Sequence, residues 1–288
     1  MRVLIADELG FCFGVRDALA TARGVTDPHS VTIHGDLVHN EAVLAELDAR
    51  GFHRSPERDR GVPRTPSVLV TAHGISERER ARLESAGKRL IDTTCPLVAK
   101  AHAAAQELAR LGYFVVVLGK PDHVEVRGIV EDLPRHAVVR GAADVVALGE
   151  PRIGIVCQTT TPIREARELA RRIRVANPDA DVRFVDTVCE PTKRRMTAVE
   201  ALASRVDAFV VVGGRHSNNT LQLVQLAERL GTRTAHVQGA ADLDPAWFAG
   251  CATVGLAAGT STLDTTIAEV RAALEALPVT TGTRRVHG

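Results

Sequence analysis

Short runs of β-branched and aliphatic residues alternate along this chain with longer segments whose apolar residues recur at helical spacing. The short runs predict strands at Val3–Ala6, Val31–His34, Val68–Thr71, Phe114–Leu118, Ile153–Val156, Val182–Val185, Phe209–Val212 and Thr253–Leu256. The longer segments predict helices at Gly14–Arg23, Glu41–Arg50, Glu77–Ala86, Leu97–Leu111, Ile163–Ala176, Lys193–Arg205, Thr220–Leu230 and Leu263–Leu277. This alternation is typical of α/β proteins with mainly parallel sheets, which bind ligands beyond the carboxyl ends of their strands.

Proline, glycine and asparagine mark several of the predicted helix boundaries. Pro96 stands in the first turn of one helix, and Gly112 follows its last turn. Asn177 and Pro178 end another helix. The segment Ser55–Pro66 is rich in Arg, Pro and Gly, and we expect it to be an exposed connection without chemistry.

The composition narrows the classes of protein that this chain can belong to. Of its 288 residues, 45% are hydrophobic and 25% charged, as in ordinary soluble proteins. A net charge of +1, no basic run and only 3% aromatic residues argue against a nucleic-acid partner. Apolar runs such as Phe114–Leu118 are too short to cross a membrane, and the N-terminus predicts a strand rather than a signal peptide. We therefore expect a cytoplasmic protein, in which five cysteines serve as metal ligands or reactive thiols more readily than as disulfides.

A pattern of polar residues recurs three times along the chain, with a period of about 90 residues. It starts at Cys12, Cys95 and Cys189. Two polar residues follow each cysteine, in loops after apolar runs. They are His39 and His73 after Cys12, His123 and Thr159 after Cys95, and Ser217 and Ser261 after Cys189. We predict three similar small α/β domains, at 1–94, 95–188 and 189–288, in a pseudo-threefold trefoil. That arrangement would bring one thiolate and two polar groups from each domain to a common centre.

The cysteines divide into two kinds. Cys157 and Cys251 lie inside apolar runs and are expected to be buried structural residues. The three recurring cysteines could hold a metal or a cluster, or could be unrelated. Structural zinc sites usually draw on Cys-x-x-Cys pairs, which this sequence lacks. Thiolates gathered from distant loops suit an iron–sulfur cluster better, and three of them would leave one iron free to bind a substrate oxygen.

The other residues in phase with the cysteines suggest an anion-binding site. They are His39, His73, His123, Thr159, Ser217, Asn219 and Ser261. Imidazole, hydroxyl and amide donors beside helix N-termini make a pocket for phosphate oxygens. Glu125 is the acidic side chain in phase with this set and the natural proton donor, provided that the pocket raises its pKa. The alternative role for a glutamate near a helix start is to compensate the helix dipole.

A series of short motifs carries a resemblance to a known family. The motifs are Gly10-Phe-Cys-Phe-Gly14, Val38-His-Asn40, Ala72-His-Gly74, Thr94-Cys-Pro96, His123-Val-Glu125, Gln158-Thr159 and Gly259-Thr-Ser261. Together they run through nearly the whole chain, which resembles the 4-hydroxy-3-methylbut-2-enyl diphosphate reductase family of the non-mevalonate isoprenoid pathway. The resemblance implies three α/β domains in a trefoil around a [4Fe–4S] cluster.

The resemblance also implies roles for individual residues. The cluster ligands would be Cys12, Cys95 and Cys189. The diphosphate would be bound by His39, His73, His123, Ser217, Asn218, Asn219 and Ser261. Catalysis would use Glu125, Thr159 and His123, with Glu125 and Thr159 relaying protons. The reaction implied is the two-electron reductive loss of an allylic hydroxyl, giving isopentenyl and dimethylallyl diphosphate, with electrons from ferredoxin or flavodoxin.

The third repeat departs from the family pattern. The family typically reads Tyr-Ala-Thr-x-Asn-Arg-Gln after its third cysteine, whereas this chain reads Glu190-Pro-Thr-Lys-Arg-Arg-Met196. Asn218 stands where a serine is usual, Leu263 where a proline is usual, and Cys157 where a threonine is common. New charges beside a cluster ligand could tune the potential of a cluster.

Several alternative functions remain open from the sequence alone. A paralogue could reduce a different allylic or aromatic substrate in specialised metabolism, whereas a degenerate copy is disfavoured by the retained cysteines and Glu125. A zinc hydrolase would use the Cys and His residues as ligands and Glu125 to activate water. A redox sensor would need no acid in its pocket. A plain α/β protein with unrelated cysteines would tolerate their replacement.

Overall fold

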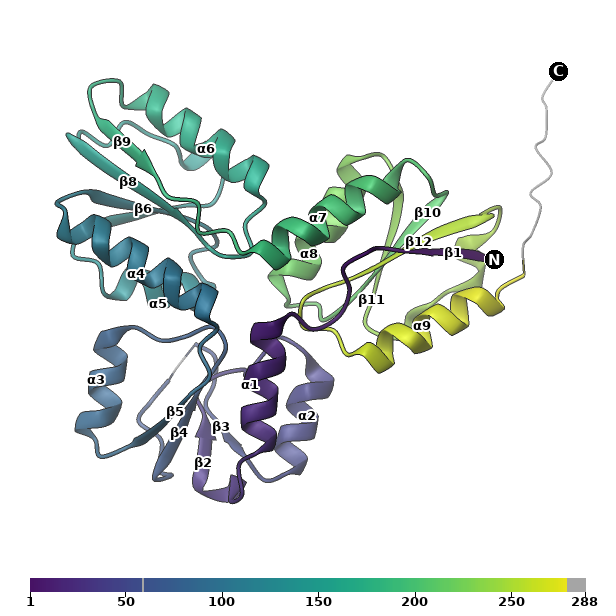
Figure 1. Cartoon of the computed structure of the whole chain (residues 1–288), viewed down its shortest axis with the longest axis horizontal. Coiled ribbons are helices and arrows are strands. Elements are labelled where there is room, and N and C mark those ends of the chain that lie inside the picture. The colour runs from purple at the N-terminus through teal and green to yellow at the C-terminus, as the bar shows by residue number, and fades with distance from the viewer. Residues whose placement is uncertain (59, 279–288) are drawn as a thin grey trace. The chain divides into compact units, whose positions relative to one another are not determined.

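The structure is a computed structural model that describes residues 1–58 and 60–278 (Figure 1). It contains three four-stranded sheets, and the strand pairs in all three are parallel. The predicted α/β class with parallel sheets is therefore confirmed. The chain divides into two compact units, which are Phe13–Cys189 (the 13–189 unit) and Met1–Cys12 with the residues from Glu190 onward (the terminal unit).

The 13–189 unit begins with a sheet in the order β3-β2-β4-β5. Its strands are β2 (Val31–Ile33), β3 (His53–Arg54), β4 (Ser67–Val70) and β5 (Arg89–Asp92). Its helices are α1 (Phe13–Arg23), α2 (Glu41–Ala49) and α3 (Glu77–Ser85). Leu83 of α3 packs on Val68 and Val70 on one face of the sheet, and α1 and α2 lie on the other face (Figure 1).

The second sheet of this unit repeats the same plan, in the order β7-β6-β8-β9. Its strands are β6 (Phe114–Leu118), β7 (His136–Val139), β8 (Arg152–Cys157) and β9 (Asp181–Phe184). Its helices are α4 (Pro96–Arg110), α5 (Val124–Glu131) and α6 (Ile163–Ala176). Leu108 of α4 and Ile129 of α5 are buried on one face, and Leu169 and Ile173 of α6 on the other.

The terminal unit holds the third sheet, in the order β1-β12-β10-β11. Its strands are β1 (Arg2–Ile5), β10 (Ala208–Val212), β11 (Arg233–Val237) and β12 (Thr253–Ala258). Its helices are α7 (Glu190–Ala203), α8 (Asn218–Arg229) and α9 (Asp264–Ala276). Short 3₁₀ turns complete the two units, and these are η1 (Pro28–Ser30), η2 (Ala142–Asp144), η3 (Ala240–Asp242) and η4 (Pro245–Phe248).

All three sheets share one strand order, but the third borrows a strand from the N-terminus. β5 and β9 are the last strands of the first two sheets, and β1 takes the equivalent place beside β12 (Figure 1). A cysteine follows each of these three strands, so Cys95, Cys189 and Cys12 occupy equivalent positions. The domain boundaries 1–94, 95–188 and 189–288 stay a prediction.

Each predicted strand and helix overlaps an observed element. The elements that the sequence pattern did not predict are short, and they are β3, β5, β7, β11 and α5. Most carry polar residues in a short run, which hides the apolar periodicity on which such predictions rest. Among the described residues, no helix is both long enough and apolar enough to cross a membrane.

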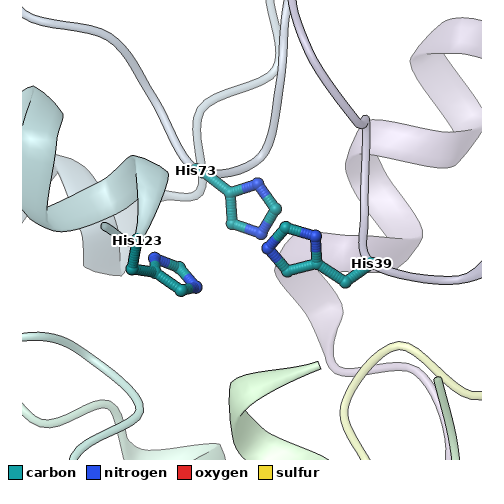
Figure 2. A group of neighbouring side chains, drawn as sticks. All are labelled: His39, His73 and His123. Atoms are coloured by element: carbon teal, nitrogen blue, oxygen red, sulfur yellow. The ribbon is translucent and has the colours of Figure 1, made fainter. Parts of the chain in front are cut away.

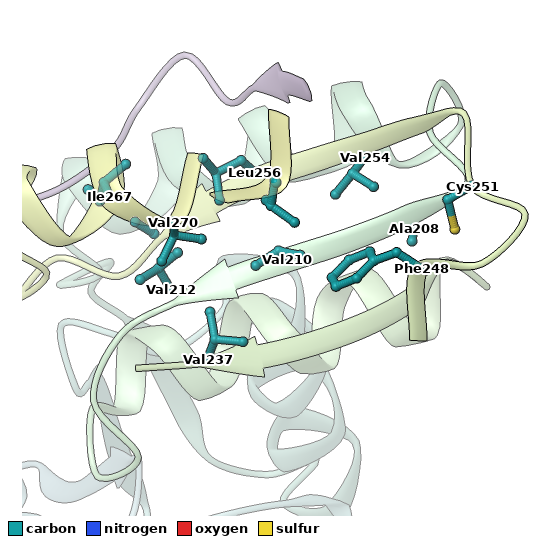
Figure 3. Close-up of a cluster of buried hydrophobic side chains, with 12 residues drawn as sticks. Ala208, Val210, Val212, Val237, Phe248, Cys251, Val254, Leu256, Ile267 and Val270 are labelled. Carbon is teal, nitrogen blue, oxygen red and sulfur yellow. The ribbon is translucent and has the colours of Figure 1, made fainter. Parts of the chain in front are cut away.

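The core of the terminal unit fills the space between the sheet and α9 (Figure 3). Val210, Val212 and Leu256 from the strands meet Val270 from the helix, and all four are fully buried. On the opposite face of the sheet, Phe209 packs where Gly255 of β12 has no side chain, and a Cβ there would lie 2.8 Å from the Phe209 ring.

Leu223 on α8 offers a test of how much this packing contributes. Its side chain is fully buried against the sheet, so Leu223→Ala should lower the free energy of unfolding by about 2–5 kcal/mol. Leu230 at the end of the same helix is 46% exposed, so Leu230→Ala should change it by only about 0.5 kcal/mol or less. Urea denaturation followed by circular dichroism measures both, and equal losses would contradict the packing described.

Candidate functional site

Three histidines from loops at the carboxyl ends of strands come together in the 13–189 unit (Figure 2). His39 precedes α2, His73 follows β4, and His123 is the N-cap of α5. The rings of His39 and His73 stack with centroids 4.4 Å apart, and His123 meets them edge-on at 5.4 and 5.6 Å. One ring nitrogen of each lies within 4.8 Å of the others. The loops that follow parallel strands therefore assemble one imidazole cluster.

The environment of this cluster keeps two of its imidazoles uncharged. Burial lowers the pKa of His73 well below its ordinary value, and positive charge on His39 or His123 would lower it further. Burial, with smaller contributions from His39 and Lys120, lowers the pKa of His123 to about 3. At neutral pH His73 and His123 are therefore neutral.

The tautomer of His123 decides what this cluster can bind. The backbone N–H of Glu125 donates to Nδ1 of His123 at 3.2 Å. Since Nδ1 accepts this bond, the neutral ring carries its proton on Nε2. A protonated Nε2 donates to an anion and cannot coordinate a cation. The three rings have a spacing that a metal could use, but this hydrogen bond favours an anion and disfavours the zinc-hydrolase hypothesis.

Glu125 lies beside His123 in the first turn of α5 and is fully buried. Its Oε1 accepts a hydrogen bond from the Thr159 backbone N–H at 2.6 Å, and its Oε2 accepts one from the Thr159 hydroxyl at 3.0 Å. Burial raises the pKa of Glu125 to about 7, although these two hydrogen bonds oppose the shift. Near neutral pH the carboxyl is thus present in both its acid and its base form.

Two of the three recurring cysteines, Cys95 and Cys189, lie in the 13–189 unit and are held against the loops that carry the polar residues. The Cys95 N–H donates to Ala72 O at 3.0 Å, next to His73, and the Cys189 N–H donates to Thr159 O at 2.9 Å. Thr159 therefore binds the carboxyl of Glu125 and the backbone of Cys189 at the same time. The acid and the thiol are fixed by one residue.

The terminal unit holds the remaining predicted site residues. Ser217 is the N-cap of α8, and the Ser261 hydroxyl donates to Ser217 Oγ at 3.4 Å. Asn218 and Asn219 follow in the first turn of α8, and all four side chains are buried. They form a compact polar group at a helix N-terminus, which suits phosphate oxygens.

Asn219 also links this polar group to the third cysteine. Its Oδ1 accepts a hydrogen bond from Thr260 N–H at 3.0 Å, and the Cys12 N–H donates to Thr260 O at 3.1 Å. The buried Nδ2 of Asn219 has no hydrogen-bond partner among the residues that the structure describes. An unpaired buried amide is costly, so this donor points to a bound acceptor.

The loop that carries Cys12 is clamped by a buried arginine. Arg195 of α7 is 2% exposed and donates to Gly10 O at 2.7 Å. Gly10 has a φ of +68°, and a Cβ there would lie 2.3 Å from Asp264 Oδ1. This turn therefore requires glycine.

Two departures from the family pattern, Glu190 and Arg194, are exposed on α7, whereas Met196 on the same helix is buried, as are Asn218 and Cys157 elsewhere. The guanidinium of Arg194 lies 3.5 Å from the Glu190 carboxylate and 3.6 Å from that of Glu8. The new charges thus neutralise one another. Arg195 occupies the arginine position of the family pattern.

The cysteine set fits an iron–sulfur group. None of the five cysteines forms a disulfide, and Cys12, Cys95 and Cys189 are half-buried. Each of these three immediately precedes a helix, where the aligned peptide dipoles favour a thiolate. Gly14 keeps the space beside Cys95 open, because a Cβ there would lie 2.5 Å from its Sγ.

The other two cysteines are structural, as expected. Cys157 is fully buried in β8, and Cys251 is 5% exposed in the core of the terminal unit.

Sequence reasoning missed one charged residue near the histidines. Arg60 lies in the segment Ser55–Pro66, which was expected to be exposed and inert, yet its side chain is only 10% exposed. No periodicity or motif surrounds it, so no pattern could have revealed it.

Comparison with known proteins decides the family. Residues 3–275 match the family described as LytB protein. This chain belongs to the LytB family. It is 35% identical over 280 residues to 4-hydroxy-3-methylbut-2-enyl diphosphate reductase of Anaeromyxobacter sp. (strain K), covering 96% of this chain and 100% of the relative. It is 32% identical over 280 residues to the reductase of that name from Aquifex aeolicus (strain VF5), covering 95% and 96% of the two chains.

A solved structure extends the likeness to three dimensions. The E-1-hydroxy-2-methyl-but-2-enyl-4-diphosphate reductase of Plasmodium falciparum matches with a TM-score of 0.88 at 25% identity, over 96% of this chain and 89% of that one. The fold of this LytB-family chain is therefore the fold of that reductase.

The stability of this LytB-family chain should depend on pH through Glu125. The unfolded chain releases the Glu125 proton near pH 4.5, but the folded chain retains it to about pH 7. Between these values stability falls as pH rises, and the ionised carboxylate then costs on the order of 3 kcal/mol. Glu125→Gln removes this titration, so relative to wild type it should be more stable at pH 8 than at pH 4.

Thermal denaturation at the two pH values measures the difference between variant and wild type. Glu228→Gln on the exposed side of α8 is the matched control and should keep the wild-type pH dependence. A Glu125→Gln variant with an unchanged pH dependence would show that burial does not shift this carboxyl.

Proposed function

We propose that this chain is a cytoplasmic reductase that converts 4-hydroxy-3-methylbut-2-enyl diphosphate to isopentenyl and dimethylallyl diphosphate. The observation that carries the proposal is the pairing of a buried acid with neutral imidazoles. Glu125 is bound by Thr159 and has a pKa of about 7, and His123 beside it presents an Nε2 proton. The names of the LytB-family relatives support the same substrate.

The binding step uses hydrogen-bond donors from histidine, serine and asparagine. In this proposal the diphosphate oxygens accept hydrogen bonds from His39, His73, His123, Ser217, Asn218, Asn219 and Ser261. The neutral ring of His73 takes up a proton as the anion arrives, because the negative charge raises its pKa, whereas His123 donates its Nε2–H and stays neutral. The unpaired Nδ2 of the buried Asn219 gains a partner at the same time.

The chemical step needs two electrons and two protons. The allylic C–O bond breaks, the hydroxyl leaves as water after gaining one proton, and the carbon skeleton gains the other proton. Glu125 is the proton source, since its carboxyl can be protonated near neutral pH. Thr159 holds that carboxyl through both oxygens, and its hydroxyl extends the relay.

Electrons require a redox group that the side chains themselves do not provide. In the proposal Cys12, Cys95 and Cys189 hold a [4Fe–4S] cluster. When bound, this group supplies single electrons and an iron without a protein ligand that acts as a Lewis acid. Ferredoxin or flavodoxin is the proposed source of the electrons.

Turnover by anaerobically purified and reconstituted protein, with a strong reductant, tests the proposal. We expect loss of substrate and formation of the two C5 diphosphates. Glu125→Gln should lower kcat by about 10²–10⁴-fold while the iron and sulfide content stays at the wild-type level. An intact cluster without turnover would contradict the proposed substrate and favour a paralogue acting on another allylic or aromatic compound.

Paired cysteine variants provide the control for the cluster. Cys95→Ser should lose iron and visible absorbance, whereas Cys157→Ser, at a fully buried position in β8, should retain both. Equal iron content in the two variants would support the reading in which the cysteines are unrelated. Wild-type turnover by Glu125→Gln would show that Glu125 is not the proton source, whereas an intact cluster that changes oxidation state without turnover would favour a redox sensor.

Binding of the diphosphate should be coupled to proton uptake. His73 and His123 are neutral in the empty site, and the nearby charges of Arg60 and Lys120 help to keep them so. We expect heats of inorganic diphosphate binding at pH 8 to differ between two buffers of different ionisation enthalpy. His73→Gln should take up fewer protons than wild type, and His123→Gln, whose Nδ1 accepts the Glu125 N–H, should take up as many as wild type. Equal heats in both buffers would rule out this coupling.

A further inference from the structure

A second polar cavity lies in the 13–189 unit, outside the residues assigned to the reaction. Its volume is about 600 Å³, and it is bounded by α3, α5 and the segment around Arg60. The charged side chains that line it are Arg60, Arg78, Arg82, Arg127, Glu79 and Glu131. Backbone, small and apolar residues make up the rest of the wall. This density of arginines is unusual for a chain with a net charge of +1.

The two carboxylates of the cavity are already engaged. Glu79 Oε2 lies 2.6 Å from Arg82 Nε, and Glu79 Oε1 lies 2.8 Å from Nε2 of the buried His34. The Ser76 hydroxyl donates to Glu131 Oε2 at 2.6 Å. The wall thus carries four guanidinium groups against two carboxylates, and this excess of positive charge favours an anion.

Arg60 is the buried member of this group. Its side chain is 10% exposed, and its Nη2 lies 3.1 Å from Glu57 Oε1. Its buried Nε has no hydrogen-bond partner among the described residues. The guanidinium can approach so closely because Gly35 has no side chain, and a Cβ there would lie 2.4 Å from Nη2. A buried guanidinium N–H without an acceptor is costly unless a ligand supplies one.

The segment that carries Arg60 is fixed in place by the same arginines. Arg82 donates to Arg60 O at 2.6 Å, and Arg127 donates to Glu57 O at 3.3 Å and to Arg58 O at 3.4 Å. The Asp36 N–H donates to the Glu57 carboxylate at 2.7 Å. The cavity is thus held open by hydrogen bonds that exist before any ligand binds, so little ordering is needed on binding.

We propose that this cavity is a second anion-binding site, which takes the phosphate or diphosphate group of a small molecule and is separate from the three-histidine site. Guanidinium groups pair with phosphate oxygens through two parallel hydrogen bonds, which an arginine-lined wall provides. Arg60 would supply the buried contact, and Arg78 and Arg127 the contacts nearer the surface. The proposal goes beyond the reductase activity and does not depend on it.

Calorimetric titration of the full-length, anaerobically purified protein tests the proposal, with inorganic diphosphate and inorganic phosphate as separate probes. We expect diphosphate to bind wild type at two sites. Arg60→Met should weaken one of them by on the order of tenfold or more, and change the three-histidine site much less, through the loss of its charge near His73 alone. His39→Ala should weaken the other site instead. Tighter binding of diphosphate than of phosphate at the Arg60 site would identify a diphosphate group as its ligand, and equal binding a single phosphate.

Two further variants keep the test decisive. Arg110→Met removes an exposed arginine on α4 that pairs with Glu107, and it should retain both sites. Arg78→Met removes an exposed arginine from the cavity wall, and it should weaken the same site as Arg60→Met even if Arg60→Met folds poorly. Diphosphate binding that survives both Arg60→Met and Arg78→Met, whether wild type shows one site or two, would overturn the proposal.

Discussion

One backbone hydrogen bond, repeated in each of the three sheets, fixes the positions of the site residues. The N–H groups of Cys95, Cys189 and Cys12 donate to the loops after β4, β8 and β12, and these loops carry His73, Thr159 and Ser261. The bond can form because the strand before each cysteine lies parallel to, and beside, the strand before each loop. Both chain segments then leave the sheet at the same edge. A thiol and a polar group are brought together in each sheet by topology alone.

The electrostatics of the 13–189 unit follow from a second constraint, which is the removal of water. Burial disfavours charge of either sign, so the same environment raises the pKa of Glu125 and lowers that of His73 and His123. The empty site therefore holds an acid and bases that are largely uncharged. In the proposed function an entering diphosphate reverses this balance for His73, because the negative charge stabilises the protonated form of that ring. The negative charge of the diphosphate also favours the protonated form of Glu125, and this is the form that the proposed reaction needs.

The sequence was informative wherever a residue followed a buried apolar strand. His39, His123, Ser217 and their partners could be predicted because the strand ends are visible as the limits of apolar runs. The pairing of β1 with β12 could not be predicted, since it joins the two ends of the chain and no local pattern records such a contact. The tautomer of His123 depends on one backbone N–H, and a sequence contains no information on that geometry.

The position of Arg60 is another feature that the sequence could not predict. The composition of Ser55–Pro66 correctly predicted an irregular segment, because arginine, proline and glycine disfavour regular structure. It could not reveal that Arg82 and Arg127, distant in the sequence, bind the backbone of this segment. Tertiary hydrogen bonds of this kind turn a polar loop into part of a cavity wall.

The charged residues Glu190 and Arg194, which depart from the family pattern after Cys189, should have little electrostatic effect on the site. Glu190 and Arg194 are both about 60% exposed and lie within 3.5 Å of each other, so water screens the pair and each charge offsets the other. Arg195, which retains the family residue, is buried and clamps the loop of Cys12. Because a buried charge acts over a longer range than an exposed pair, Arg195 should dominate the electrostatic environment of that loop. The loop of Cys12 is thus held by the buried Arg195 and not by the exposed pair of Glu190 and Arg194.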